Sequence, residues 1–237
     1  MSRLTKMVLG NFAQIVKLYF AARRRAKHPE KYSEIDFYTQ MQKVMRSAIR
    51  KGNVDLQIFG RENIPQENGF IIYGNHQGVF DPIAIGSDFR GPLAAVLKDE
   101  LKNVVLVKQL VQATNSLPMD RNDVRQSLTV IRAVTEEVQN GRNYLIFPEG
   151  TRSKNGNVMG DFHSGSFKAA MKAKCPILPV AYIDSFAVLD RKGTQPVQVQ
   201  LHYLKPILFE EYQGMTTVAL AAMVKERIQA VLDEYAK

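Results

Sequence analysis

A histidine and an aspartate lie five residues apart at the end of a predicted strand over residues 70–74. Beside an imidazole, a carboxylate fixes the tautomer and leaves the second ring nitrogen free to act as a base. On a regular helix this spacing would turn the two side chains about 140° apart. They therefore meet only through a turn, which Gly78 permits. His76 and Asp81 are a candidate base and orienting acid; alternatively, Asp81 simply caps the helix that opens at Pro82.

Two arginines, like His76, follow predicted strands. Arg152 lies in the segment FPEGTRS, residues 147–153, directly after a predicted strand at 143–147. There its planar guanidinium could bind a phosphate with two parallel hydrogen bonds. Arg121 ends the segment LPMDR, residues 117–121, and is a candidate second ligand for the same anion. The alternatives are surface ion pairs with Glu149 and Asp120, which contribute little energy.

A fourth segment, PILPV at residues 176–180, is apolar and has a proline at its centre. Pro179 fixes its own φ and removes a backbone donor. On its residues alone, the segment is typical of an edge strand.

The elements that must position these residues alternate between strands and helices. Such alternation predicts an α/β fold with a mixed, largely parallel sheet flanked by helices. In these folds, ligand sites gather where loops leave the carboxyl ends of the strands. Predicted strands cover 54–58, 70–74, 93–97, 117–119, 143–147, 177–183 and 197–204, and predicted helices cover 82–88, 99–112, 123–140, 164–173 and 216–236.

The first fifth of the chain has a different character. Residues 1–51 contain 12 Lys and Arg but only 3 Asp and Glu, whereas the remainder contains 20 of each. The whole net charge of +9 therefore lies in this segment. Two amphipathic helices are predicted here, at about 7–22 and 34–50. The first has a basic polar side and an apolar side formed by Leu9, Phe12, Val16, Tyr19 and Phe20.

This segment is too short and too interrupted to span a bilayer. It predicts a membrane-surface element at 1–51 that precedes an α/β domain at 52–237. Packing of the helices onto that domain is the alternative. A basic excess confined to amphipathic helices favours an anionic lipid surface over nucleic acid.

The length and composition of the chain bear on whether it needs disulfides or metal ions for its stability. A chain of 237 residues can bury a sizeable core without disulfides or metal. Its single cysteine, Cys175, excludes an internal disulfide and a Cys-rich zinc site. We predict that this thiol is inert packing and that the protein has no metal site and no cofactor.

The four segments together resemble the glycerolipid acyltransferase family, and specifically its 1-acyl-sn-glycerol-3-phosphate acyltransferases. Members of that family carry N-H-x-x-x-x-D, a short block ending in D-R, the block F-P-E-G-T-R-S and an apolar block with a central proline. All four occur here in family order, between Asn75 and Val180. The resemblance implies an enzyme that transfers a fatty acyl group from acyl-CoA or acyl carrier protein to the sn-2 hydroxyl of lysophosphatidic acid, giving phosphatidic acid.

The resemblance also implies a role for each site residue. His76 would be the general base and Asp81 its partner. Arg152 and Arg121 would bind the phosphate of the acceptor. The remaining substrate-binding positions are Lys98, which matches a basic position between the first two blocks; Glu149 and Gly150, which would shape the phosphate site; and Pro179, in the pocket wall. One departure from the family pattern is visible. Relatives commonly have a basic residue near an F-x-x-G motif after the third block, whereas this chain has His163 within Phe162–Gly165.

Two expectations complete the hypothesis. The tetrahedral oxyanion would be stabilised by backbone N–H groups near the Asn75–Gly78 turn. The enzyme would act as a peripheral protein on the cytoplasmic face of the cell membrane. The alternatives are an acyltransferase for glycerol-3-phosphate or another lysophospholipid, and a non-catalytic lipid- or nucleic-acid-binding protein. Acyl-chain length, the donor and oligomeric state are not predicted by the sequence.

Overall fold

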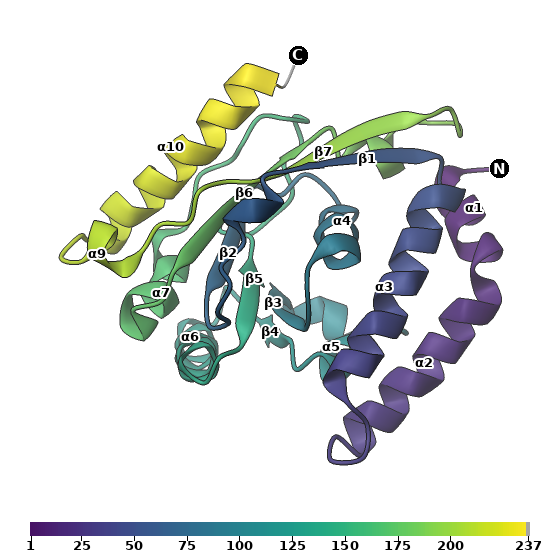
Figure 1. The fold of residues 1–237 in the computed structure, drawn as a ribbon, viewed down its shortest axis with the longest axis horizontal. Coiled ribbons are helices and arrows are strands. Elements are labelled where there is room, and N and C mark those ends of the chain that lie inside the picture. The colour runs from purple at the N-terminus through teal and green to yellow at the C-terminus, as the bar shows by residue number, and fades with distance from the viewer. Residues whose placement is uncertain (236–237) are drawn as a thin grey trace.

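The computed structural model describes residues 1–235 and has the predicted α/β architecture (Figure 1). Position 236, the predicted end of the last helix, lies outside the described residues. The strands are β1 (Val54–Phe59), β2 (Ile71–Gly74), β3 (Leu93–Lys98), β4 (Leu117–Met119), β5 (Asn143–Ile146), β6 (Ile177–Ile183) and β7 (Val197–Tyr203). The α-helices are α1 (Arg3–Gly10), α2 (Phe12–Lys27), α3 (Glu34–Lys51), α4 (Asp81–Asp88), α5 (Val107–Ala113), α6 (Val124–Gln139), α7 (Lys168–Ala173), α8 (Ala187–Asp190), α9 (Phe209–Tyr212) and α10 (Thr217–Tyr235). Short 3₁₀ turns are η1 (Arg61–Asn63), η2 (Asp99–Asn103) and η3 (Ser164–Phe167).

The sheet is mixed and largely parallel, as predicted. Its strand order is β1-β7-β6-β2-β5-β3-β4. The five strands from β6 to β4 are parallel, while β7 is antiparallel to β6 and carries β1 parallel to itself. Five carboxyl ends therefore meet at one edge of the sheet. The loops that follow β2, β3, β4, β5 and β6 all start from this edge.

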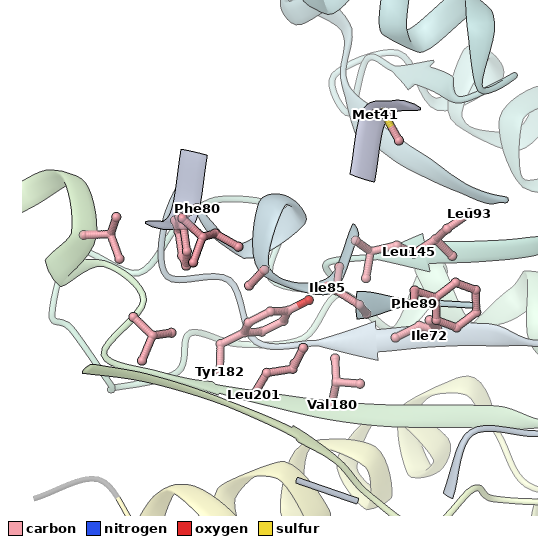
Figure 2. Close-up of a cluster of buried hydrophobic side chains, with 14 of the residues drawn as sticks. Met41, Ile72, Phe80, Ile85, Phe89, Leu93, Leu145, Val180, Tyr182 and Leu201 are labelled. Carbon is pink, nitrogen blue, oxygen red and sulfur yellow. The ribbon is translucent and has the colours of Figure 1, made fainter. Parts of the chain in front are cut away.

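Helices cover both faces of the sheet (Figure 1). Helices α3 and α4 lie on one face, while α6, α7 and α10 lie on the other. Because both faces are buried, central strands such as β2 and β6 are almost continuously apolar. Figure 2 shows the first face, where Ile85 of α4 and Met41 of α3 lie above Ile72, Val180 and Leu201 of the sheet.

Pro179 lies buried in a central strand rather than in an edge strand. It is opposite Tyr73 of β2. On the β7 side, regular pairing stops at Val180, and the next bridge joins Ile177 to Ile207. The missing N–H of the proline therefore falls where the ladder is already interrupted, which is where a sheet tolerates proline.

The N-terminal segment forms three helices rather than the two predicted. The first predicted helix is broken at Asn11, whose side chain donates to the Met7 carbonyl over 2.7 Å. Met7, Leu18 and Ala22 are buried against the domain, so α1 and α2 share its core. Within residues 1–235, no helix combines the length and apolarity needed to cross a membrane.

A buried arginine fixes α1 to the carboxyl edge of the sheet. The guanidinium of Arg3 donates to the carbonyls of Gly52 (2.9 Å), Val188 (2.7 Å) and Gln195 (2.6 Å). Burial and the nearby charge of Arg191 lower the pKa of Arg3. Val188 belongs to α8, which follows β6, so α1 is attached beside the loops that leave this edge.

The predicted helix at 99–112 is wrong in its first half. Residues there form the 3₁₀ turn η2, and α5 begins only after Leu106, whose φ is +71°. The Leu106 N–H, which has no helical partner at this break, donates to Gln109 Oε1 over 2.8 Å. Apolar periodicity alone did not reveal this break.

Candidate active site

His76 and Asp81 meet as predicted at the carboxyl end of β2. His76 Nδ1 lies 2.7 Å from Asp81 Oδ2. Because a carboxylate only accepts, this contact places the ring proton on Nδ1 and leaves Nε2 as an acceptor. The imidazole stacks on Phe147, with 4.1 Å between ring centroids. Its side chain is 20% exposed, whereas that of Asp81 is fully buried. The outer nitrogen is thus available to a ligand.

Asp81 is the first residue of α4, but its carboxylate turns back toward the loop before the helix. Oδ2 accepts the N–H groups of Gln77 (2.7 Å) and Gly78 (2.9 Å) in addition to the imidazole. Oδ1 accepts from Ser185 Oγ. Simple capping of α4 by this carboxylate is therefore wrong. Position at a helix N-terminus still favours its negative charge.

These contacts also correct the expected oxyanion donors. The N–H groups of Gln77 and Gly78 are both directed to Asp81. The His76 N–H is directed to Glu149 Oε1 over 2.7 Å. These three N–H groups stabilise the turn itself, so they are not directed at a substrate.

Glu149 joins the loop after β5 to the His76 turn. Its second oxygen accepts the Gly160 N–H over 2.7 Å, and its side chain is buried. Burial raises the pKa of Glu149, although the two backbone donors oppose this effect. Four residues later, the Ser153 N–H donates to the His76 carbonyl over 2.7 Å. The segment that carries Arg152 is thus attached to the His76 turn at both ends.

Arg121 lies in the loop after β4 and reaches Gly150. A Cβ atom added to Gly150 would lie 2.9 Å from Arg121 Cζ and 3.1 Å from His163 Cδ2. Gly150 has a φ of +76°, a conformation that favours glycine, and the Arg121 guanidinium occupies the space that a side chain here would take. Partial desolvation lowers the pKa of Arg121, against the opposing charge of Glu100. The guanidinium stays protonated near neutral pH.

A cavity of about 410 Å³ opens beside this arginine. Phe147, which stacks on His76, contributes to its wall. The lining is mainly apolar, with Arg121, His163 and Lys168 among its polar members. A mainly apolar cavity with a few cationic groups suits an amphiphilic anion.

The other predicted substrate-binding residues occupy different surroundings. Lys98 is at the same edge, at the end of β3, where it is 64% exposed and pairs with Glu100 over 2.8 Å. Arg152 is exposed and directly precedes Ser153. Pro179 is buried in the interior of the sheet. The structure thus brings Arg121 and Gly150 into contact, sets Arg152 in the loop tied to His76, and leaves Lys98 at the rim.

A larger hollow of about 1,720 Å³ lies elsewhere. Asn143, Pro92 and Asn68 line it, and these residues precede or begin β5, β3 and β2. It therefore borders the amino ends of these strands, at the edge opposite His76.

Sequence reasoning missed two side chains that support the site, Ser185 and Asn157. Ser185 contacts Asp81 and follows β6. The Asn157 amide donates to Asp184 over 3.0 Å and accepts from Gln77 over 2.7 Å. Neither Ser185 nor Asn157 lies in the four segments, and single serines and asparagines in loops carry no distinctive pattern.

Cys175 is buried just before β6, near the amino edge and away from His76. Burial raises the pKa of this thiol to about 12. We therefore expect it to be a neutral thiol at about pH 8 and to resist iodoacetamide until the protein unfolds. Thiol titration with and without denaturant tests this, and Cys175→Ala should keep kcat within about twofold. Rapid labelling of the native protein would contradict it.

Across residues 1–235, no group of three or more His, Cys, Asp or Glu side chains is arranged to hold a metal ion.

The chain is similar to known acyltransferases. It is 28% identical over 197 residues to the 1-acyl-sn-glycerol-3-phosphate acyltransferase of Borreliella burgdorferi, covering 80% of this chain and 78% of that one. The protein of the same name from Salmonella typhimurium is 29% identical over 185 residues, covering 77% and 75%.

The fold matches a crystal structure of the 1-acyl-sn-glycerophosphate acyltransferase PlsC from Thermotoga maritima. The TM-score is 0.69 at 22% identity, covering 96% of this chain and 97% of that chain. The profile of the acyltransferase family matches residues 55–183, which run from β1 to the end of β6 and include the eight site residues predicted from the sequence. The protein therefore belongs to the acyltransferase family.

Proposed function

We propose that this enzyme transfers a fatty acyl group from a thioester donor to the sn-2 hydroxyl of 1-acyl-glycerol-3-phosphate, giving phosphatidic acid. The observation that carries this proposal is the His76–Asp81 pair, with Nε2 available at the edge that also holds Arg121 and Arg152. The relatives named above carry the corresponding activity in their names.

In the proposed mechanism, His76 Nε2 removes the proton of the sn-2 hydroxyl as its oxygen attacks the thioester carbonyl. A tetrahedral oxyanion forms and collapses, the carbon–sulfur bond breaks, and the thiolate leaves. His76 then returns its proton to the thiolate. The carboxylate of Asp81 stabilises the imidazolium in between. No covalent acyl-enzyme is required, in keeping with the buried position of Cys175.

The cationic groups would bind the acceptor phosphate. Arg152 and Arg121 are its proposed ligands, with Lys98 at the rim of the same edge. Glu149 and Gly150 contribute indirectly, since one holds the His76 turn and the other leaves room for Arg121. Fixing the phosphate would bring the hydroxyl to within about 3 Å of His76, and such positioning supplies much of the rate.

The N-terminal helices support action at a membrane. The apolar side predicted from the sequence is exposed: Phe12 is 62% and Phe20 54% accessible, and Leu4, Val8, Leu9 and Val16 continue the stripe. The helices pack onto the domain through other residues, including Leu18 and Ala22. Exposed Lys17, Arg23 and Arg24 accompany the stripe. We propose that this surface binds anionic lipid on the cytoplasmic side of the membrane.

A thiol-release assay tests the proposed reaction. The purified protein is given acyl-CoA or acyl carrier protein as donor and, separately, lysophosphatidic acid, glycerol-3-phosphate or another lysophospholipid as acceptor. Release that depends on lysophosphatidic acid, with phosphatidic acid as the product, is expected. Turnover only with another acceptor would reassign the substrate.

The membrane contact is tested without deleting the helices, because they share the core. The double variant Phe12→Ser/Phe20→Ser should partition at least about tenfold more weakly onto phosphatidylglycerol vesicles in a sedimentation assay. Leu208→Ser/Val218→Ser removes exposed apolar side chains elsewhere and serves as the control. Equal sedimentation of both variants and the wild type would exclude this stripe as the anchor.

A further inference from the structure

A buried hydroxyl at the end of β6 contacts the oxygen of Asp81 that faces away from His76. Ser185 is 1% exposed, and its Oγ donates to Asp81 Oδ1. Oδ2 accepts three hydrogen bonds, from the imidazole and two backbone N–H groups. Within the described chain, Oδ1 accepts from Ser185 alone. This hydroxyl is therefore the contact that holds the second oxygen of the carboxylate, while the other three hydrogen bonds hold the first.

The position of Ser185 is itself fixed from two directions. Its N–H donates to Gln77 Oε1 over 2.9 Å, so the residue after His76 holds it. Its neighbour Asp184, in a left-handed conformation with φ of +58°, exchanges two hydrogen bonds with the side chain of Asn157. Gln77 closes the circuit by donating to the same Asn157 over 2.7 Å.

The direction of the hydroxyl proton follows from the acceptors. Ser185 Oγ has one proton and two nearby acceptors, the Gln77 amide oxygen at 3.1 Å and the closer Asp81 carboxylate. A charged acceptor forms the stronger bond. Without the hydroxyl, a buried carboxylate oxygen would lose its donor, which is costly at a site that excludes water.

We propose that Ser185 is a positioning residue that holds Asp81 in the orientation His76 needs as a base. This inference rests on the proposed function and adds a component from β6 to the pair. Ser185 touches neither the proposed hydroxyl nor the thioester, so its effect passes through Asp81. Its removal should therefore lower turnover while leaving the binding of the phosphate almost unchanged.

The test compares Ser185→Ala with Ser87→Ala in the full-length protein. Ser87 is a similarly buried serine on α4, and its hydroxyl donates to the Ala84 carbonyl over 2.8 Å. We expect Ser185→Ala to lower kcat about 10- to 100-fold, with KM for lysophosphatidic acid changed by less than about twofold. Ser87→Ala should keep kcat near the wild-type value at a comparable loss of melting temperature.

Two further measurements separate positioning from general damage. Ser185→Cys has similar volume but donates weakly, so its kcat should fall between those of serine and alanine. The proton NMR signal of the His76 Nδ1–H, assigned by its absence in His76→Ala, should move or broaden in Ser185→Ala and stay unchanged in Ser87→Ala. Should Ser185→Ala fail to fold, the cysteine variant carries both readouts.

The outcomes are distinct. Wild-type kcat in Ser185→Ala, or equal losses in Ser185→Ala and Ser87→Ala, would overturn the inference. So would an unmoved Nδ1–H signal, or wild-type kcat in the cysteine variant where only that variant folds. An inactive His76→Ala beside a fully active Ser185→Ala removes only this inference, whereas an active His76→Ala removes the proposed mechanism itself.

Discussion

Replacing His76 with alanine is expected to lower kcat for acyl transfer by about 10²- to 10⁴-fold, because the only ring nitrogen presented to a ligand by the His76–Asp81 pair is lost. KM for the acceptor should change little, since the phosphate ligands remain. Thiol release with lysophosphatidic acid measures both constants. The melting temperature of the variant should fall moderately, because the buried carboxylate of Asp81 loses one donor and Phe147 loses its stacking partner.

Asp81→Asn sharpens this prediction. Where the amide oxygen takes the place of Oδ2 and accepts from the Nδ1–H, the NH₂ group takes the place of Oδ1 and meets the Ser185 hydroxyl, which donates there in the wild type. Turnover should fall strongly, and the fold should also lose stability. His28→Ala, at a half-exposed histidine in the α2–α3 turn, is the control. Undiminished turnover in a folded His76→Ala protein would exclude His76 as the base.

The second large effect is expected at the proposed phosphate ligands. Arg152→Ala should reduce kcat/KM for lysophosphatidic acid about 10- to 100-fold, mainly through KM, because charge-assisted hydrogen bonds to phosphate are lost. Arg121→Ala should act in the same direction. Kinetics at varied acceptor and saturating donor provide the measurement. KM for the donor should stay unchanged.

Conservative and remote variants complete this test. Arg152→Lys keeps the charge but loses the planar fork, so partial recovery is expected. Arg125→Ala removes an exposed arginine on α6 and should leave acceptor kinetics unaffected. If Arg152→Ala shows the same acceptor dependence as Arg125→Ala, Arg152 does not bind the phosphate.

Much of the sheet could be predicted, because buried parallel strands are short apolar runs bounded by turns. The same patterns located His76, Glu149 and Arg121 at strand ends. Helix breaks were harder: the break at Asn11 depends on one side chain bonding to a carbonyl, and the break at Leu106 on one unusual φ. Neither changes the apolar periodicity.

The sequence predicted contacts within the site only where the type of a residue restricts the partners that it can have. The Arg121 guanidinium, from the loop after β4, occupies the space beside Gly150, and this pairing is visible only in three dimensions. Ser185 illustrates the other limit. Ser185 is 104 positions from Asp81 in the sequence, and the two residues meet because β2 and β6 are neighbours in the sheet. A sequence pattern does not reveal such a contact.

The attachment of α1 through Arg3 has a geometric consequence for an enzyme that works on lipids. Since the guanidinium binds carbonyls of α8 and of neighbouring loops, α1 and the exposed side chains that it carries cannot tilt independently of the sheet edge. On a bilayer, the height of His76 above the head groups would then be set by the depth to which Leu4, Val8 and Leu9 of α1 enter the lipid. A single buried side chain, Arg3, would in this way couple the insertion depth of a helix to the distance between His76 and the lipid head groups.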